Sequence, residues 1–311
     1  MTRRLTMLTA GIALLTALPA AAQDRLTVYS AGPANLIEAL SAGFTAETGI
    51  PVDVFQGTTG QVMARIEAEA SNPVVDVLIS ASWDTATDFE ARGWLLAHTS
   101  PNAETVPDFL KTDYAVAQGI SALAIAWNPT SGTPRPEDWD DLAGPDFADL
   151  VTMPDPAQSG SAFELVAALY GQSDDWSLFE ALAANGLVVP GANAQALNPV
   201  LQGAKAAVFG AVDYIAIGRA AEGEAIEVIF PASGTVIAPR PAMILEWTRN
   251  ADAARAFIDY MLSDEGQAAV AAVYLMPART DIPADRLLIG DLTLLPIDVE
   301  AVYAARQEIL A

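Results

Sequence analysis

The 311-residue chain contains no cysteine. It can therefore form no disulfide, it carries no cysteine for a lipid anchor, and it offers no thiolate to a metal ion. Histidine is almost as scarce, because His98 is the only one. A single histidine without a histidine partner is weak evidence for catalysis or for a metal site. We therefore expect no metal and no cofactor.

Basic residues are also few. The chain has 39 Asp and Glu against 15 Lys and Arg, for a formal net charge of −24, and its lysines are Lys111 and Lys205. A surface this acidic repels nucleic acid and anionic lipid, so we expect neither as a partner. An anionic ligand would have to be held by local dipoles rather than by the field of the whole molecule.

Long apolar runs are missing after the N-terminus. Arg3 and Arg4 precede a mostly apolar stretch at residues 5–18, and small residues at 20–22 suit cleavage, a pattern typical of a signal peptide. A retained anchor is the alternative, but a membrane-spanning helix needs about 20 apolar residues. Removing residues 1–22 of 311 leaves 289 residues. Together with the absence of cysteine, this predicts a protein of the bacterial periplasm.

The remaining chain alternates strand-like and helix-like patterns. Strands are predicted at residues 25–30, 50–57 and 75–80, with helices between them, which favours an α/β fold with a parallel, doubly wound sheet. A second lobe is predicted to begin near the apolar segment 118–129. Residues 206–223 and 226–245 are predicted to be long strands that return to the first lobe, which puts Tyr214 in a strand.

Small polar residues follow each strand of the first lobe, and "DPAQSGSA" repeats the arrangement in the second lobe. Ligands of open parallel sheets bind at the carboxyl ends of strands. Backbone amides at a helix start carry about +0.5 charge and form an anion site. Capping of the following helix is the alternative for each loop. The candidate ligand-binding residues are Ser30, Gly57, Thr58, Thr59, Gly60, Ser80, Ser82, Trp83, Ser159 and Ser161.

Signals of an enzyme are weak. "GTTGQ" lacks the lysine of a phosphate-binding P-loop, and "QSGSA" lacks the GxSxG spacing of a hydrolase. The aspartates are dispersed among the strand ends. We therefore expect a binding protein, and a periplasmic enzyme or an adaptor protein remains an alternative.

Several stretches resemble a known family. "FQGTTGQVMARIEAEASNPVVDVLIS", "FPASGT" and "AFIDYMLSDEGQ" are similar to the type II periplasmic solute-binding proteins of ABC importers, in the branch of the ferric-binding proteins. The resemblance implies two doubly wound α/β lobes with a hinge and a ligand cleft between them. It divides the chain into residues 23–115 plus 236–275 for lobe 1 and 116–235 plus 276–311 for lobe 2. It also implies a monomer that delivers its solute to a permease in the inner membrane.

Departures from the family pattern bear on the ligand. Ferric-binding proteins use adjacent tyrosines, whereas this chain has Asp213 before Tyr214 and no histidine in the first loop. Ferric iron would find few anionic oxygens here. Similarity to molybdate-binding relatives implies that Ser30, Thr58 or Thr59, and Tyr214 hold an oxyanion. Our first choice is an organic phosphonate or phosphate ester, with Asp213, Trp83 or Asp84 facing its remainder; ferric iron and an inorganic oxyanion are the alternatives.

Overall fold

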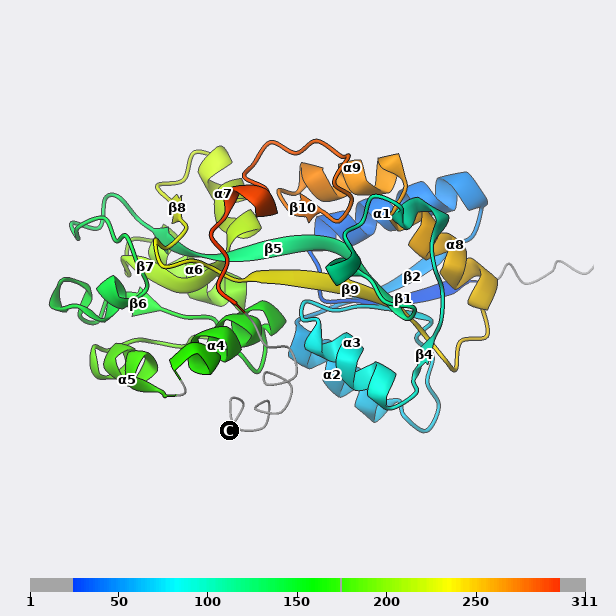
Figure 1. The fold of residues 1–311 in the computed structure, drawn as a ribbon, viewed down its shortest axis with the longest axis horizontal. Coiled ribbons are helices and arrows are strands. Elements are labelled where there is room, and N and C mark those ends of the chain that lie inside the picture. The colour runs from blue at the N-terminus through cyan, green and yellow to red at the C-terminus, as the bar shows by residue number, and fades with distance from the viewer. Residues whose placement is uncertain (1–24, 174, 297–311) are drawn as a thin grey trace, which may run out of the picture.

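A computed structural model describes residues 25–173 and 175–296. The predicted signal peptide lies outside this range and stays a prediction. The described strands form one mixed sheet in the order β2-β1-β3-β9-β5-β7-β6, in which β8 and β10 also pair with β5 and β4 also pairs with β9. Helices gather at both ends of this sheet and form two lobes (Figure 1). The α/β prediction is confirmed.

The first lobe follows the predicted order. The apolar stripe of its first helix is buried through Leu36, Leu40 and Phe44, and Gly49 ends the helix at a φ of 75°, as a C-terminal glycine should. The central strand of this lobe pairs in parallel with both of its neighbours, so their carboxyl ends meet at one edge. The elements are β1 (Leu26–Ser30), α1 (Ala34–Thr48), β2 (Val52–Gln56), α2 (Thr59–Ala68), β3 (Val77–Ile79), α3 (Asp84–Ala91) and β4 (Leu95–Leu96).

The second lobe has a core of its own, built around Trp139, Phe147, Phe209 and their neighbours. Its strand β6 runs parallel to β7, and helix α4 begins directly after the predicted "DPAQS" loop. The elements are β5 (Ala115–Trp127), β6 (Val151–Thr152), α4 (Gly160–Ser173), α5 (Ser177–Ala184), α6 (Asn193–Leu201), β7 (Ala207–Val212), α7 (Asp213–Ala221) and β8 (Glu227–Ile229).

One prediction in this lobe is wrong. The segment 206–223 is not a long strand, because β7 ends at Val212 and α7 begins at Asp213. Tyr214 therefore lies in the first turn of a helix. Asp213, the first residue of α7, suits the positive end of the helix because it is acidic. Its Oδ1 accepts a hydrogen bond from the backbone amide of Tyr214 at 2.7 Å. The segment 226–245 likewise contains two strands, β8 and β9 (Ile237–Leu245), of which β9 does return to the first lobe.

Two long strands join the lobes. β5 and β9 pair antiparallel and run through the middle of the molecule from one lobe to the other (Figure 1). Their register shifts between Ala117 and Ile120, so the ladder is irregular where the lobes meet. Such an interruption is a suitable place for bending.

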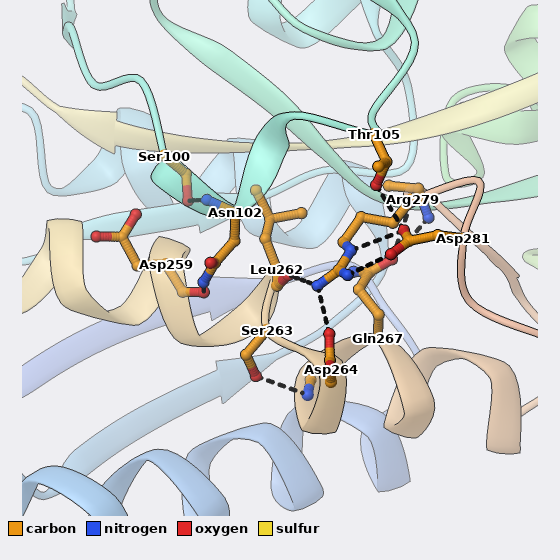
Figure 2. Close-up of polar contacts among 12 residues, drawn as sticks. Ser100, Asn102, Thr105, Asp259, Leu262, Ser263, Asp264, Gln267, Arg279 and Asp281 are labelled. Carbon is orange, nitrogen blue, oxygen red and sulfur yellow. Dashed lines mark hydrogen bonds and ion pairs between the residues drawn. The ribbon is translucent and has the colours of Figure 1, made fainter.

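The two helices that follow β9 pack against the first lobe. Helices α8 (Ala251–Met261) and α9 (Asp264–Ala272) are followed by β10 (Met276–Pro277), which pairs with β5. Arg279 fastens this segment, because its guanidinium bonds the Leu262 carbonyl and pairs with Asp264 and Asp281 (Figure 2). The pairing with Arg279 holds the pKa of Asp281 well below its usual range. The predicted division into lobes by residue number stays a prediction.

Of the helices described here, none combines the length and the apolar composition needed to cross a membrane.

Candidate functional site

The carboxyl ends of three sheet strands meet at the boundary between the lobes. The Ala31 amide donates to the Ile79 carbonyl at 2.8 Å, and the Ser80 amide donates to the Pro241 carbonyl at 3.0 Å. Ser30 and Ser80 are both fully buried. The loop after β1 therefore lies against the end of β3, and the start of the loop after β3 lies against β9.

The loop after β2 uses its two threonines differently. The Thr58 hydroxyl accepts from the Gln61 amide at 3.2 Å, while Gln61 Oε1 accepts from the Thr58 amide at 2.9 Å. This reciprocal pair is a capping box for α2. Thr59 instead faces the second lobe, where its hydroxyl accepts from the Gly160 amide at 3.3 Å.

Two glycines allow the lobes to touch. A Cβ atom at Gly60 would lie 2.6 Å from the carbonyl oxygen of Ala157, and one at Gly160 would lie 2.9 Å from Ser82 Cβ. Distances below 3.0 Å are too short for carbon contacts, so both positions require glycine in this arrangement. The structure thus has the loops of lobe 1 closed against the start of α4.

The serines at the start of α4 form a small buried network. Ser159 Oγ lies 3.1 Å from Ser161 Oγ, donates to Asn193 Oδ1 at 2.9 Å and accepts from the Ala162 amide at 3.2 Å. Ser159 therefore helps to cap α4. Contact of either serine with a ligand stays a prediction.

A buried arginine, which the sequence analysis missed, lies at the centre of the boundary. Arg240 of β9 is 2 % exposed. Its Nη2 donates to the Ala31 carbonyl at 2.6 Å, but its Nε has no hydrogen-bond partner and no carboxylate among the described residues pairs with it. A buried charge without a counter-ion is costly, so this guanidinium is suited to receive an anion.

Other polar groups surround the same place. Gln118 of β5 is 1 % exposed and its Oε1 has no partner among the described residues. A Cβ atom at Gly32 would lie 3.1 Å from Ser30 Oγ and 3.7 Å from Gln118 Oε1, so both side chains border the loop that Arg240 bonds. Arg240 Cζ lies 5.7 Å from the centre of the Tyr214 ring. We call Ser30, Gln118, Tyr214 and Arg240 the hinge cluster.

Asp213 and Tyr214, the two residues at the start of α7, differ in their surroundings: Tyr214 belongs to the hinge cluster, whereas Asp213 forms an ion pair with Arg286. Burial raises the pKa of Tyr214, with Arg240 opposing the shift, so its hydroxyl stays neutral and can donate. Asp213 is paired with Arg286 at 2.5 Å. Burial raises the pKa of Asp213 and Arg286 opposes the change. Because its carboxyl group is already engaged, a contact between Asp213 and a ligand stays a prediction without support.

A surface groove of about 500 Å³ opens beside Tyr214. Residues of α1, α7 and the turn after α9 line it, so it too lies between the lobes. Tyr214 belongs to the hinge cluster and also lines the groove. The residues that line the groove include Pro33, Asn35, Tyr214, Arg219, Glu222 and Tyr274.

Residues 25–173 and 175–296 contain no group of three His, Asp or Glu side chains placed to hold a metal ion. His98 lies away from the hinge cluster and contacts Asp259 Oδ1 at 2.8 Å.

The sequence of residues 26–272 matches the model of the bacterial extracellular solute-binding proteins. The chain belongs to this family. The predicted type II solute-binding fold of ABC importers is thereby confirmed, and the coarse role is that of a solute-binding protein with a membrane permease as its partner. The family members it resembles are binding proteins rather than enzymes.

Named relatives differ in their ligands. The putative 2-aminoethylphosphonate-binding periplasmic protein of Salmonella typhimurium is 25% identical over 291 residues, which cover 87% of this chain and 84% of the relative. Iron uptake protein A1 of Synechocystis is 25% identical over 284 residues, covering 85% of this chain and 78% of the relative. The structure of AfuA from Actinobacillus pleuropneumoniae, with fructose-6-phosphate bound, superposes with a TM-score of 0.84 at 23% identity over 93% of this chain and 97% of AfuA.

Proposed function

We propose that this protein captures a small organic anion, a phosphonate or a phosphate ester, between its lobes in the periplasm and delivers it to the membrane permease of an importer. The observation that carries the proposal is Arg240, a buried guanidinium with no ion pair among the described residues. Charged donors bind phosphate-like oxygens more strongly than neutral donors do, and arginine is the residue best suited to the task.

The groove beside Tyr214 favours an organic ligand over a bare oxyanion. An inorganic ion would fill the hinge cluster alone, whereas a volume of about 500 Å³ next to Tyr214 leaves room for the remainder of a larger molecule. The relatives named for 2-aminoethylphosphonate and fructose-6-phosphate support this class. Ferric iron is disfavoured, because the cationic Arg240 lies 5.7 Å from the ring of the one tyrosine in the cluster and iron prefers anionic oxygens.

The first test is a calorimetric titration with 2-aminoethylphosphonate, fructose-6-phosphate, molybdate, sulfate and ferric citrate as separate probes. We expect saturable binding of at least one of the two organic anions, with a plateau that shows no turnover. Tight binding of ferric citrate alone, or of molybdate or sulfate alone, would contradict the proposal.

Arg240→Gln is the decisive variant. A hydrogen bond to a charged group contributes about 1.5 to 3 kcal/mol, so we expect affinity for the bound organic anion to fall about 10- to 100-fold. Arg249→Gln is the matched control, because Arg249 is an exposed arginine shortly after β9. Equal affinities of the two variants would exclude Arg240 from the site.

A further inference from the structure

A buried carboxyl group crosses the boundary between the lobes. Glu164 belongs to α4 of the second lobe and is 6 % exposed. Its Oε1 accepts from the Ser82 hydroxyl at 2.7 Å and from the Trp83 amide at 3.0 Å, and both donors belong to the loop before α3 in the first lobe.

The geometry is notable because one oxygen receives both donors. Oε2 receives neither of them, so it is available to carry a proton while Oε1 keeps both bonds. A neutral carboxyl group is therefore compatible with every contact that Glu164 makes here.

Few charged side chains lie near Glu164 that could stabilise its ionised form. β5 and β7, which pack against α4, carry no ionisable side chain, and β9 carries Arg240 alone. α4 has no other acidic or basic side chain, and α3 contributes Asp84 beside Trp83, itself buried. No ion pair joins Glu164 to Arg240 or to any other described residue.

We propose that Glu164 acts as a proton-dependent latch: its protonated carboxyl group fastens lobe 2 to Ser82 and Trp83 of lobe 1, and its ionised form favours opening. The inference concerns closure of the two lobes, whatever solute lies between them. Glu164 is a positioning residue, because it acts by holding the lobes together.

The sign of the pH effect follows from burial. Desolvation raises the pKa of Glu164 above its ordinary value of 4.5, more than the bonds from Ser82 and Trp83 lower it. In an open state these lobe 1 groups no longer cover Glu164, and its pKa returns toward the ordinary value. The closed state therefore binds the proton more tightly. Closure is most favoured at low pH and loses this advantage as the pH rises through the pKa of the closed state.

The test measures closure directly. Because the chain has no cysteine, Glu90→Cys on α3 and Glu180→Cys on α5, both exposed, introduce two specific sites for a fluorophore pair. Single-molecule energy transfer on the full chain then reports the fraction of closed molecules without any solute. For the chain with Glu164 we expect the ratio of closed to open molecules to fall by roughly tenfold between pH 5 and pH 8, because the closed state loses the advantage of binding the proton more tightly.

Two variants distinguish the effect of ionising Glu164 from the effect of losing a hydrogen bond between the lobes. Glu164→Gln keeps an acceptor oxygen and cannot ionise, so its closed fraction should stay high and independent of pH. Ser82→Ala removes one donor and should lower the closed fraction at pH 5, which provides a second variant if Glu164→Gln does not fold. Glu67→Gln, exposed on α2, is the control and should retain the pH dependence.

Three results would overturn the latch: no closed population at either pH, a closed fraction that does not change with pH, or the same pH dependence in Glu164→Gln. Since no solute is present, a failure of phosphonate binding leaves this measurement intact. The two proposals can therefore fail separately.

Discussion

At the scale of single residues, neighbours in the sequence have separate tasks. Thr58 and Thr59 are both small, polar and placed before a helix, so the sequence leaves capping and ligand binding open for each. In the structure, the Thr58 hydroxyl belongs to the capping box of α2, and the Thr59 hydroxyl reaches the Gly160 amide of the other lobe. The spacing from Thr58 to Gln61 fits the pattern of a capping box, whereas no residue pattern shows that the Thr59 hydroxyl reaches the other lobe.

Alanine variants of the two threonines should therefore differ in kind. Thr58→Ala is expected to lower the free energy of unfolding by about 1 kcal/mol, the usual contribution of a helix cap. Thr59→Ala should leave stability nearly intact and weaken binding of the best organic-anion probe by about 2- to 10-fold, because it removes a hydrogen bond formed on closure. Chemical denaturation and calorimetry measure the two effects. A larger loss of stability in Thr59→Ala than in Thr58→Ala would reverse the assignment.

At the scale of elements, the sequence predicted most of the first lobe. Apolar spacing fixed α1 through Leu36, Leu40 and Phe44, and the order of strands and helices placed the three loops at one edge. The sequence did not predict α7, because this alanine-rich segment after a buried strand has no clear helical period in its apolar residues.

Two members of the hinge cluster, Gln118 and Arg240, were missed for another reason. Arg240 stands between two prolines in an otherwise apolar run, and that isolated charge was the available signal. Its importance depends on burial and on the absence of an ion pair among the described residues, which only the packed strands reveal. Glu164 likewise has no sequence signal, since its donors come from another lobe.

Helix α4 allows a prediction about closure. Gly160→Ala places a methyl group 2.9 Å from Ser82 Cβ, so it should oppose contact between the lobes and weaken binding of the organic anion at least tenfold. Gly171→Ala lies in the same helix with no atom within 4 Å of its new Cβ, and it should bind normally. Alanine has a higher helix propensity than glycine, so neither variant should lower the free energy of unfolding in the absence of solute. Equal affinities in calorimetry would show that the bound state does not bring these loops together.

At the scale of the whole molecule, the proposed ligand and the protein carry charge of the same sign. The chain has a formal net charge of −24, whereas the hinge cluster holds a buried cation. The field of the surface and the field of the site therefore oppose each other for an approaching anion. Their ranges differ, since the net charge acts over distances set by salt and Arg240 acts only after entry.

Ionic strength should separate these two fields. The screening length falls from about 30 Å at 0.01 M salt to about 8 Å at 0.15 M, so added salt removes long-range repulsion while leaving the buried contact less affected. We expect the association rate constant of the best organic-anion probe to rise several-fold over this range, with a small change in the dissociation rate constant. Stopped-flow tryptophan fluorescence with sodium chloride, repeated with potassium chloride to exclude a specific ion effect, measures both. An association rate that falls with salt would mean that the positive potential of the cleft extends beyond its mouth and outweighs the acidic surface.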